Sequence, residues 1–183
     1  QDGRDVLALV LEGLRKSLMI GIIAGTMTTV IAAVVGSFAA YFGGWVERIL
    51  MWFTDLFLVL PALLVLAIVT SSLSPGSGGT IVWLIVLLAV FSWMLSARVI
   101  RSLTLSIKER DFVRAAKYMG VSGPRIIGRH ILPNMATLLI VDATLAIAGT
   151  VLAETTLSFL GVGIRPPDTS LGSLIALGQG MAT

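Results

Sequence analysis

The chain has 183 residues, of which 56% are hydrophobic and only 13% are charged, and its mean hydropathy is +0.98. A soluble domain carries about 25% charged residues, so this composition excludes a disordered chain and argues strongly against a soluble one. There is no cysteine, which excludes disulfides, thiol catalysis and cysteine-based zinc sites, and the single histidine, His130, cannot supply a multi-histidine metal site. The first residue is Gln rather than Met, so we expect the chain to be part of a longer one.

Long uncharged stretches predict membrane-spanning helices. Residues 17–41 and 56–97 carry no charge, although the second stretch is interrupted by a turn-rich segment at 71–80, and 131–153 contains a single acid, Asp142. A bilayer core about 30 Å thick needs about 20 apolar residues in a helix. The apolar character is too continuous for β-barrel strands, which alternate at every residue. We therefore predict an all-α polytopic membrane bundle, a single transmembrane domain over 1–183 with about four spans near 17–41, 49–70, 81–104 and 132–153.

The basic residues predict the orientation of these spans. Nine of the thirteen Lys and Arg residues lie at Arg48 or between Arg98 and Arg129, and the loop at 71–80 has none. Because basic loops stay in the cytoplasm, we expect the segment around 108–130 to be cytoplasmic and both ends of the chain to lie outside.

Small residues and one proline predict how the spans pack. Gly21 and Gly25, and likewise Gly36 and Ala40, are four residues apart, which places them on one helix face and lets another backbone approach closely. Pro61 removes a backbone hydrogen bond inside the second span and should kink it.

Three acids lie at or near membrane depth, where a carboxylate is expensive and usually faces a cavity or a partner. For Asp142 the sequence leaves a role in the transport path and a structural hydrogen-bonding role equally open. For Asp55 we favour the structural role. Glu154 opens a segment, 154–172, that we expect to be an external loop or a partly re-entrant segment, either packed on the bundle or offered to a partner.

The segment between Arg98 and Pro133 carries eight basic residues against two acids. A short helix is predicted over 110–120, since Asp111 suits a helix start and Gly120 a helix end. Phe112, Ala116 and Met119 share one face of that helix, and a second short helix is predicted to begin at Pro124. The pattern by itself leaves two interpretations open, an interfacial helix on anionic lipid and a docking helix that inserts into another protein. The basic residues are poorly interleaved with aromatics, so we expect no nucleic-acid partner.

Motifs of covalent chemistry are absent from the sequence. There is no P-loop, no His-Glu-x-x-His and no Ser-x-x-Lys, and the Gly161-x-Gly163 pair lacks the context of a dinucleotide site. We expect no catalytic, cofactor-binding or metal-binding residues in this chain.

One motif in the basic segment resembles the EAA motif of ABC-importer permeases, usually written E-A-A-x3-G-x9-I-x-L-P. Its residues here are Arg114, Ala115, Ala116, Gly120, His130, Leu132 and Pro133. Arg114 stands where glutamate is usual and His130 where isoleucine is usual. The His form is similar to that of the dipeptide, oligopeptide and nickel permeases.

Three further stretches are similar to the C-type permease subunit of that group, so the resemblance covers essentially the whole chain. They are residues 3–5 followed by 12–18, residues 55–61, and residues 154–163 followed by Pro166, Pro167 and 170–172. Such subunits have six spans, which implies one span before and one after the part seen here, as in the core of a type I importer transmembrane domain.

The resemblance implies a function and partners. The chain would be a permease of a bacterial cytoplasmic (inner) membrane, working by alternating access with a second homologous permease, two ATPase subunits and an extracytoplasmic solute-binding protein. ATP and Mg would bind to the ATPases, which the residues from Arg114 to Pro133 would engage, and Ala116→Glu would impair transport by obstructing that docking site. An external or gating segment would include Glu154, Leu157, Ser158, Phe159, Leu160 and Gly161.

Two other functions fit the composition less well. An ion-coupled secondary transporter would use Asp142 or Glu154 as its coupling acid, but it leaves the basic segment unused. A membrane assembly protein with no transport path would accumulate no solute.

Overall fold

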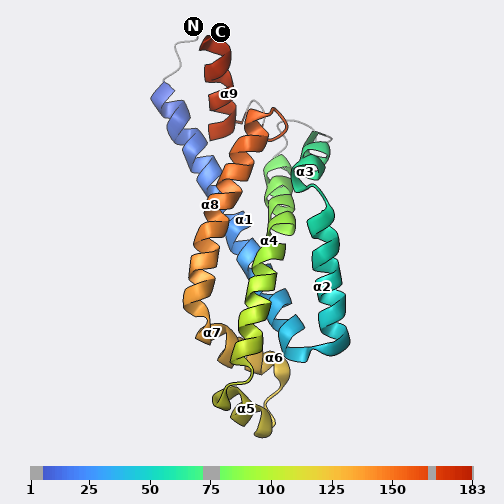
Figure 1. The fold of residues 1–183 in the computed structure, drawn as a ribbon. Coiled ribbons are helices and arrows are strands. Elements are labelled where there is room, and N and C mark those ends of the chain that lie inside the picture. Colours follow the sequence, from blue (N-terminus) through green and yellow to red (C-terminus); the bar gives the residue numbers. More distant parts are fainter. Residues whose placement is uncertain (1–5, 72–78, 165–167, 183) are drawn as a thin grey trace. The chain divides into compact units, whose positions relative to one another are not determined.

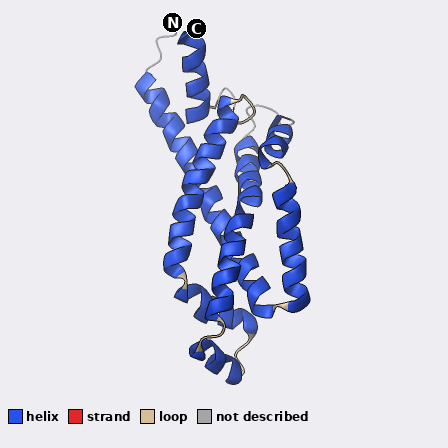
Figure 2. Cartoon of the chain, in the orientation of Figure 1, coloured by secondary structure: helices blue, strands red, loops and turns tan. Residues whose placement is uncertain are grey.

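The computed structural model describes residues 6–71, 79–164 and 168–182, and all regular structure in these ranges is helical (Figure 2). The long helices are α1 (Val6–Phe42), α2 (Gly44–Val59), α3 (Ala62–Ser71), α4 (Gly79–Ile107), α8 (Ala136–Phe159) and α9 (Leu171–Ala182). The short ones are α5 (Asp111–Tyr118), α6 (Gly123–Ile126), the single π-helical turn η1 (Ile127–Ile131) and α7 (Leu132–Asn134). The predicted all-α class is confirmed.

Three of these helices are long and apolar enough to cross a membrane, namely α1, residues 81–107 of α4, and α8. The pair α2 and α3 counts as a fourth if it forms one broken span. The break lies where Pro61 predicted a kink: Leu60 is extended, with φ −73° and ψ 130°, because the residue before a proline is disfavoured in the helical region.

The chain divides into two compact units. Unit 1 comprises residues 1–26, 61–90 and 145–183, and unit 2 comprises residues 27–60 and 91–144. The long helices α1, α4 and α8 each contribute one part to either unit.

In unit 1, the first half of α1 packs closely against the second half of α8. A Cβ atom added at Gly25 would lie 2.6 Å from the backbone N and Cα of Ile147, and one at Gly21 would collide with Val151. The Thr150 hydroxyl donates to the carbonyl of Gly21 across the same seam. The close approach predicted for this glycine pair is therefore confirmed, because no larger residue leaves room for the second backbone.

In unit 2, the short helices α5 and α6 lie near the end of α4 (Figure 1), and one hydrophobic cluster joins the short helices to the long ones. Its buried members are Ala32, Ala33, Ala97, Ile100, Val113, Ala116, Ile126, Ile127, Ile131 and Met135. Gly36 brings α1 against α4, since a Cβ there would lie 2.5 Å from the carbonyl oxygen of Ala97. The cluster fixes α5, α6 and η1 on the ends of α1 and α4 within this unit.

Candidate functional site

The inner face of α5 is part of the core of unit 2. Val113 is 2% exposed and Ala116 is 1% exposed. Phe112 and Met119, which the spacing placed on the same face as Ala116, are 39% and 76% exposed, so these three residues do not form a buried face. The buried contact is made one residue further round the helix, by the pair Val113 and Ala116, because that pair meets the α1 and α4 side chains.

The burial of Ala116 changes the meaning of the expected Ala116→Glu effect. A carboxylate at this position would enter the hydrophobic cluster of the chain itself, where an unpaired charge is strongly destabilising. Loss of transport in that variant would report misfolding of the segment rather than an obstructed docking site.

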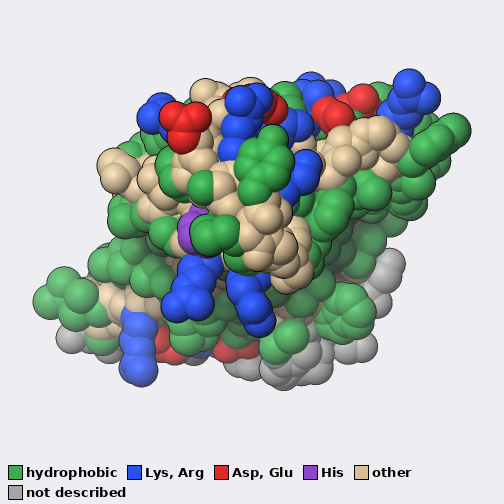
Figure 3. Space-filling model, turned by 90° about the horizontal axis from the view of Figure 1, so that it is seen from below, with side chains coloured by type: hydrophobic (Ala, Val, Ile, Leu, Met, Phe, Trp, Pro, Cys, Tyr) green, Lys and Arg blue, Asp and Glu red, His purple; other side chains and the backbone are tan. Residues whose placement is uncertain are grey.

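The opposite side of α5, which we call the outer face, is uncovered. Phe112, Ala115, Tyr118 and Met119 are exposed on it, Tyr118 by 89%. Arg114 is also exposed and forms an ion pair with Glu109 at 2.9 Å, with both side chains about three-fifths exposed. Seen from this end, Lys and Arg side chains lie among hydrophobic ones (Figure 3).

Gly120 ends α5 by adopting a conformation that other residues resist. Its φ is +79°, its amide donates to the carbonyl of Lys117 at 3.0 Å, and the Val121 amide donates to the carbonyl of Ala116 at 3.1 Å. These two bonds form a Schellman motif, in which the left-handed residue is usually glycine. Nothing lies within 4 Å of a Cβ placed at Gly120, so its backbone conformation is what calls for glycine here.

The second short helix predicted from Pro124 is a composite of α6, η1 and α7. Pro124 lies in the first turn of α6, and the π-helical turn that follows contains His130. The backbone carbonyl of His130 accepts a hydrogen bond from Asn134 Nδ2 at 2.7 Å. Leu132 packs beside the hydrophobic cluster, whereas Pro133 is exposed. The motif residues thus belong to one segment. Ala116 is buried in it, whereas Arg114, Ala115 and Pro133 are exposed on its surface.

Polar contacts also attach this segment to the long helices of unit 2. Lys108 Nζ donates to the carbonyl of Ala40 at 2.8 Å. Arg101 forms an ion pair with Glu47, to which its Nε donates at 2.6 Å. Gly123 lies against the rings of Tyr41 and Phe42, since a Cβ there would approach them to 2.8 and 2.9 Å.

The acids Asp55 and Asp142 have different surroundings in unit 2. Asp55 is exposed and forms an ion pair with Arg98. Asp142 accepts hydrogen bonds from the Thr29 hydroxyl at 2.9 Å and from the Ser96 hydroxyl at 2.6 Å. Its carboxylate therefore links α8 to α1 and α4, and within the described residues it forms no ion pair.

Glu154 is fully buried in unit 1. Its Oε2 accepts a hydrogen bond from Ser17 and its Oε1 accepts one from Ser158, both at 2.7 Å. The two serines in turn accept the amides of Leu171 at 3.3 Å and Ile164 at 3.0 Å. Since an amide can only donate, each serine hydroxyl is left to donate to Glu154, and this arrangement matches an acceptor-only carboxylate.

The residues after Glu154 continue α8 to Phe159 instead of starting the loop or re-entrant segment expected there. Leu157 and Ser158 are buried, whereas Phe159 and Leu160 are 39% and 63% exposed. Gly161, with φ +76°, ends the helix through a second Schellman motif. The expected segment thus has one side packed in unit 1 and one side uncovered. Pro166 and Pro167 lie outside the described residues.

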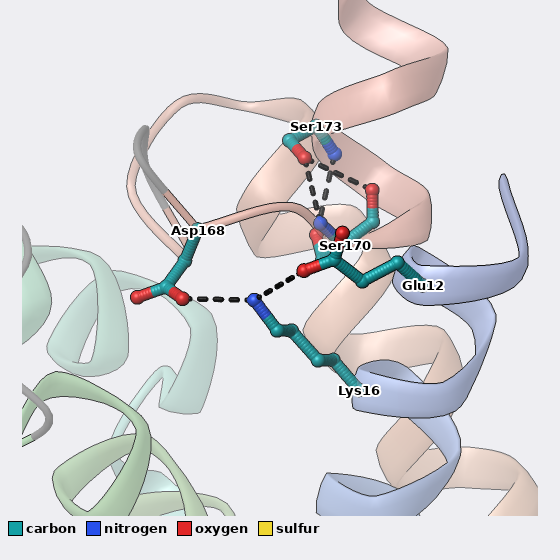
Figure 4. Close-up of polar contacts among 5 residues, drawn as sticks. All are labelled: Glu12, Lys16, Asp168, Ser170 and Ser173. Carbon is teal, nitrogen blue, oxygen red and sulfur yellow. Dashed lines mark hydrogen bonds and ion pairs between the residues drawn. The ribbon is translucent and has the colours of Figure 1, made fainter. Parts of the chain in front are cut away.

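An ion pair and a helix cap position the start of α9 (Figure 4). Lys16 Nζ lies between Glu12 and Asp168, at 3.1 Å and 2.9 Å from their carboxylate oxygens. Ser170 and Ser173 bond reciprocally, since each backbone amide donates to the other hydroxyl, at 2.8 and 3.3 Å. This capping box satisfies amides at the start of α9 that would otherwise lack a partner.

Sequence reasoning missed the hydroxyl partners of the two α8 acids, Ser17, Thr29 and Ser96. The signal that could have found them is the presence of polar hydroxyls in otherwise apolar helices, since an acid in such a helix needs donors. Among the described residues no three His, Cys, Asp or Glu side chains gather into a group that could hold a metal ion.

Comparison with known proteins places the chain in a family. Residues 32–183 match the family described as the binding-protein-dependent transport system inner membrane component. The chain is 52% identical over 181 residues to the oligopeptide transport system permease proteins OppC of Mycobacterium bovis and Mycobacterium tuberculosis, covering 99% of this chain and 62% of theirs. It is 35% identical over 173 residues to OppC of Lactococcus lactis, covering 94% of this chain and 58% of that protein.

The chain thus spans about three-fifths of the length of these relatives. The family match and the apolar helices agree on a multi-pass protein of the inner membrane. The chain belongs to the family of binding-protein-dependent transport system inner membrane components.

Proposed function

We propose that this chain is a permease subunit of an ATP-driven ABC importer for peptides, or for related solutes such as nickel complexes, and that it forms half of the translocation path. Its family and the names of its relatives, which are oligopeptide transport permeases, support this function. The single structural observation that carries the mechanism is the division of α5 into a buried inner face and an uncovered outer face.

The outer face of α5 is the proposed docking surface for an ATPase subunit. One side of a docking helix must be fixed to the membrane helices, so that movement of the docking helix also moves them. The other side must be exposed, so that the ATPase can bind to it. Val113 and Ala116 supply the fixed side, and Ala115, Tyr118 and Met119 supply the free side. Ala115 is small and exposed, which would let a partner backbone approach α5 closely.

Movement of α5 would reach the membrane helices through the contacts of unit 2. The hydrophobic cluster and the bond from Lys108 to Ala40 tie the segment to α1 and α4, and η1 and α7 lead directly into α8. Closure of the ATPases on ATP and Mg, which this chain would not itself bind, would thus tilt the spans and alternate access to the path.

The proposal places a second homologous permease beside this chain and a solute-binding protein on its external face. Of the residues in the apolar stretch of α8, only 6% are buried, against 44% in α1 and 33% in α4, so α8 has more surface left for lipid or a second permease than either of these helices. In this arrangement both ends of the chain lie outside the membrane, and the exposed Phe159 and Leu160 would lie on the external side.

Affinity isolation of the full-length protein from its native membrane in mild detergent tests the coupling proposal. The wild type should retain P-loop ATPases. Ala115→Glu should lose them because it puts a charge on the outer face, while Ala136→Glu makes the same exchange at an exposed site at the start of α8 and should retain them.

Equal ATPase recovery with Ala115→Glu and Ala136→Glu would refute the docking surface. Absence of any ATPase from the wild type would refute the importer itself. Uptake of peptides into cells with ATP depleted and the ion gradient intact would refute the ATP-driven mechanism.

A further inference from the structure

A groove lies in unit 2 between the end of α1 and α5. Its volume is about 770 Å³, and its walls include Tyr41 and Phe42 from α1, Lys108, and Arg114, Lys117 and Tyr118 from α5. This volume is within the range of small-ligand sites, which is about 300 to 1,000 Å³. The groove borders the outer face of α5, and α1 forms its other wall.

The groove is cationic. The side chains that line it include three cations, Lys108, Arg114 and Lys117, and one acid, Glu109. Glu109 is already paired with Arg114, and this exposed pair contributes little, so it is readily replaced by a stronger anion. Lys117 forms no ion pair with any residue of the described ranges, so the groove has positive charge to offer an anion.

Part of this charge is held in place. Lys108 uses one of its three N–H bonds to reach the carbonyl of Ala40, which holds its ammonium group at the α1 wall and leaves two donors. Tyr41 is fixed by Gly123 on one side and by an edge-on contact with Phe42, with ring centroids 5.2 Å apart. A ligand would therefore meet a wall that is already ordered.

The groove adjoins the end of α1, a candidate membrane span whose last residue is Phe42. Phe42 is 48% exposed and Trp45 is 76% exposed, with the Arg48 guanidinium 5.6 Å from the Trp45 ring centroid. Exposed aromatic and basic residues at the end of a span are typical of the depth at which lipid headgroups lie. The anions concentrated at that depth are phosphates of phospholipids.

We propose that this groove binds the phosphate of an anionic phospholipid, with Lys108 and Lys117 as its main cationic contacts and Tyr41 and Phe42 against the glycerol backbone. The site would link the ATPase-docking helix to the composition of the surrounding membrane. The groove shares Arg114 and Tyr118 with the outer face of α5, but its α1 wall and its main cationic contacts, Lys108 and Lys117, are separate from that face. Lipid binding itself does not depend on the proposed import function.

The test uses the full-length protein reconstituted in phosphatidylcholine bilayers with and without phosphatidylglycerol. Native mass spectrometry after gentle extraction measures the phosphatidylglycerol retained. Lys108→Gln combined with Lys117→Gln removes two groove cations, and Lys117→Gln alone, on an exposed helical position, guards against misfolding of the double variant. Arg125→Gln combined with Arg129→Gln is the matched control, since these exposed cations lie outside the groove.

We expect the double groove variant to retain phosphatidylglycerol roughly thirtyfold more weakly, because each cation near a membrane surface contributes about a fivefold gain in affinity. Lys117→Gln alone should lower retention about fivefold, and the control should match the wild type. Equal loss in the groove and control variants would overturn the proposal.

Two other outcomes would also overturn it. Complete displacement of the lipid by millimolar inorganic phosphate would assign the groove to a free anion. Loss of the lipid whenever ATPase is bound, together with protection of Lys117 from amine labelling, would assign the groove to the ATPase interface. ATPase recovery is measured on the same samples. A missing ATPase would therefore count against the importer proposal, whereas missing lipid would count against the lipid site.

Discussion

Replacing Glu154 by leucine should destabilise the packing of α8 against α1 in unit 1. The carboxylate is fully buried and accepts hydrogen bonds from Ser17 on α1 and Ser158 on its own helix. Leucine fills much of the same volume but accepts nothing. Two buried hydroxyls would then lose their acceptor while still holding the amides of Leu171 and Ile164.

The magnitude follows from those two bonds. A hydrogen bond to a charged group contributes about 1.5 to 3 kcal/mol, and an orphaned buried hydroxyl costs about 1 to 3 kcal/mol. A serine in a helix can turn to the carbonyl four residues earlier, which recovers part of the loss. We therefore expect Glu154→Leu to lower the free energy of unfolding by about 2 to 4 kcal/mol, and Glu154→Gln, which keeps one acceptor oxygen, by about half of that.

Unfolding of the purified protein in mixed micelles measures this loss, with Glu12→Leu as the matched exchange at an exposed site. Glu12 contributes only a surface pair with Lys16, so its loss should cost less than about 1 kcal/mol. Ser17→Ala should cost about 1.5 to 3 kcal/mol in the wild type but clearly less in the Glu154→Leu background. Additive effects of Ser17→Ala and Glu154→Leu, or a Glu154→Leu loss no larger than that of Glu12→Leu, would refute the network.

Three further predictions concern packing, the end of α5 and docking. Gly25→Ala should lower the free energy of unfolding by about 1 to 3 kcal/mol because its Cβ would meet the backbone of Ile147. Gly149→Ala, whose Cβ would enter open space, should be neutral or stabilising in thermal unfolding. Equal melting temperatures for these two variants would contradict the close packing of α1 on α8. Gly120→Ala should cost about 1 to 2 kcal/mol because its φ is +79°, and an unchanged unfolding free energy would exclude the left-handed cap. Arg114→Ala should leave thermal stability within about 1 kcal/mol of wild type, since its pair with Glu109 is exposed, while lowering ATPase recovery; a large stability loss would show a structural role instead.

The sequence determined which parts of the chain are membrane helices, because hydrophobic length is a local property. The uncharged stretches overlap α1, the α2 and α3 pair, α4 and α8, and Pro61 marked the break between α2 and α3. The helix ends differ, since α1 begins at Val6 rather than near residue 17 and α2 at Gly44 rather than near residue 49. Gly120 was also readable as a helix end, since its need for glycine comes from its own backbone conformation rather than from a distant partner. The spacing of Gly21 and Gly25 indicated a close contact but not that its partner is Ile147.

The direction in which α5 faces could not be read from its own pattern. Spacing placed Phe112, Ala116 and Met119 together, but the cluster from α1 and α4 selects Val113 and Ala116 as the buried pair. An eight-residue helix with apolar residues on several sides has no unique apolar face. Its neighbours therefore decide the choice, and with it which alanine is available for docking.

The partners of the membrane acids were likewise decided only by the tertiary structure. The sequence showed that Asp142 and Glu154 lie in apolar helices and need donors, but Thr29 and Ser17 are more than a hundred residues away from them along the chain. A helix pattern specifies which side chains share a face and says nothing of which face from another helix meets it. For Glu154 that pairing depends on the packing of α1 against α8 in unit 1, where Gly21 and Gly25 let the two backbones approach.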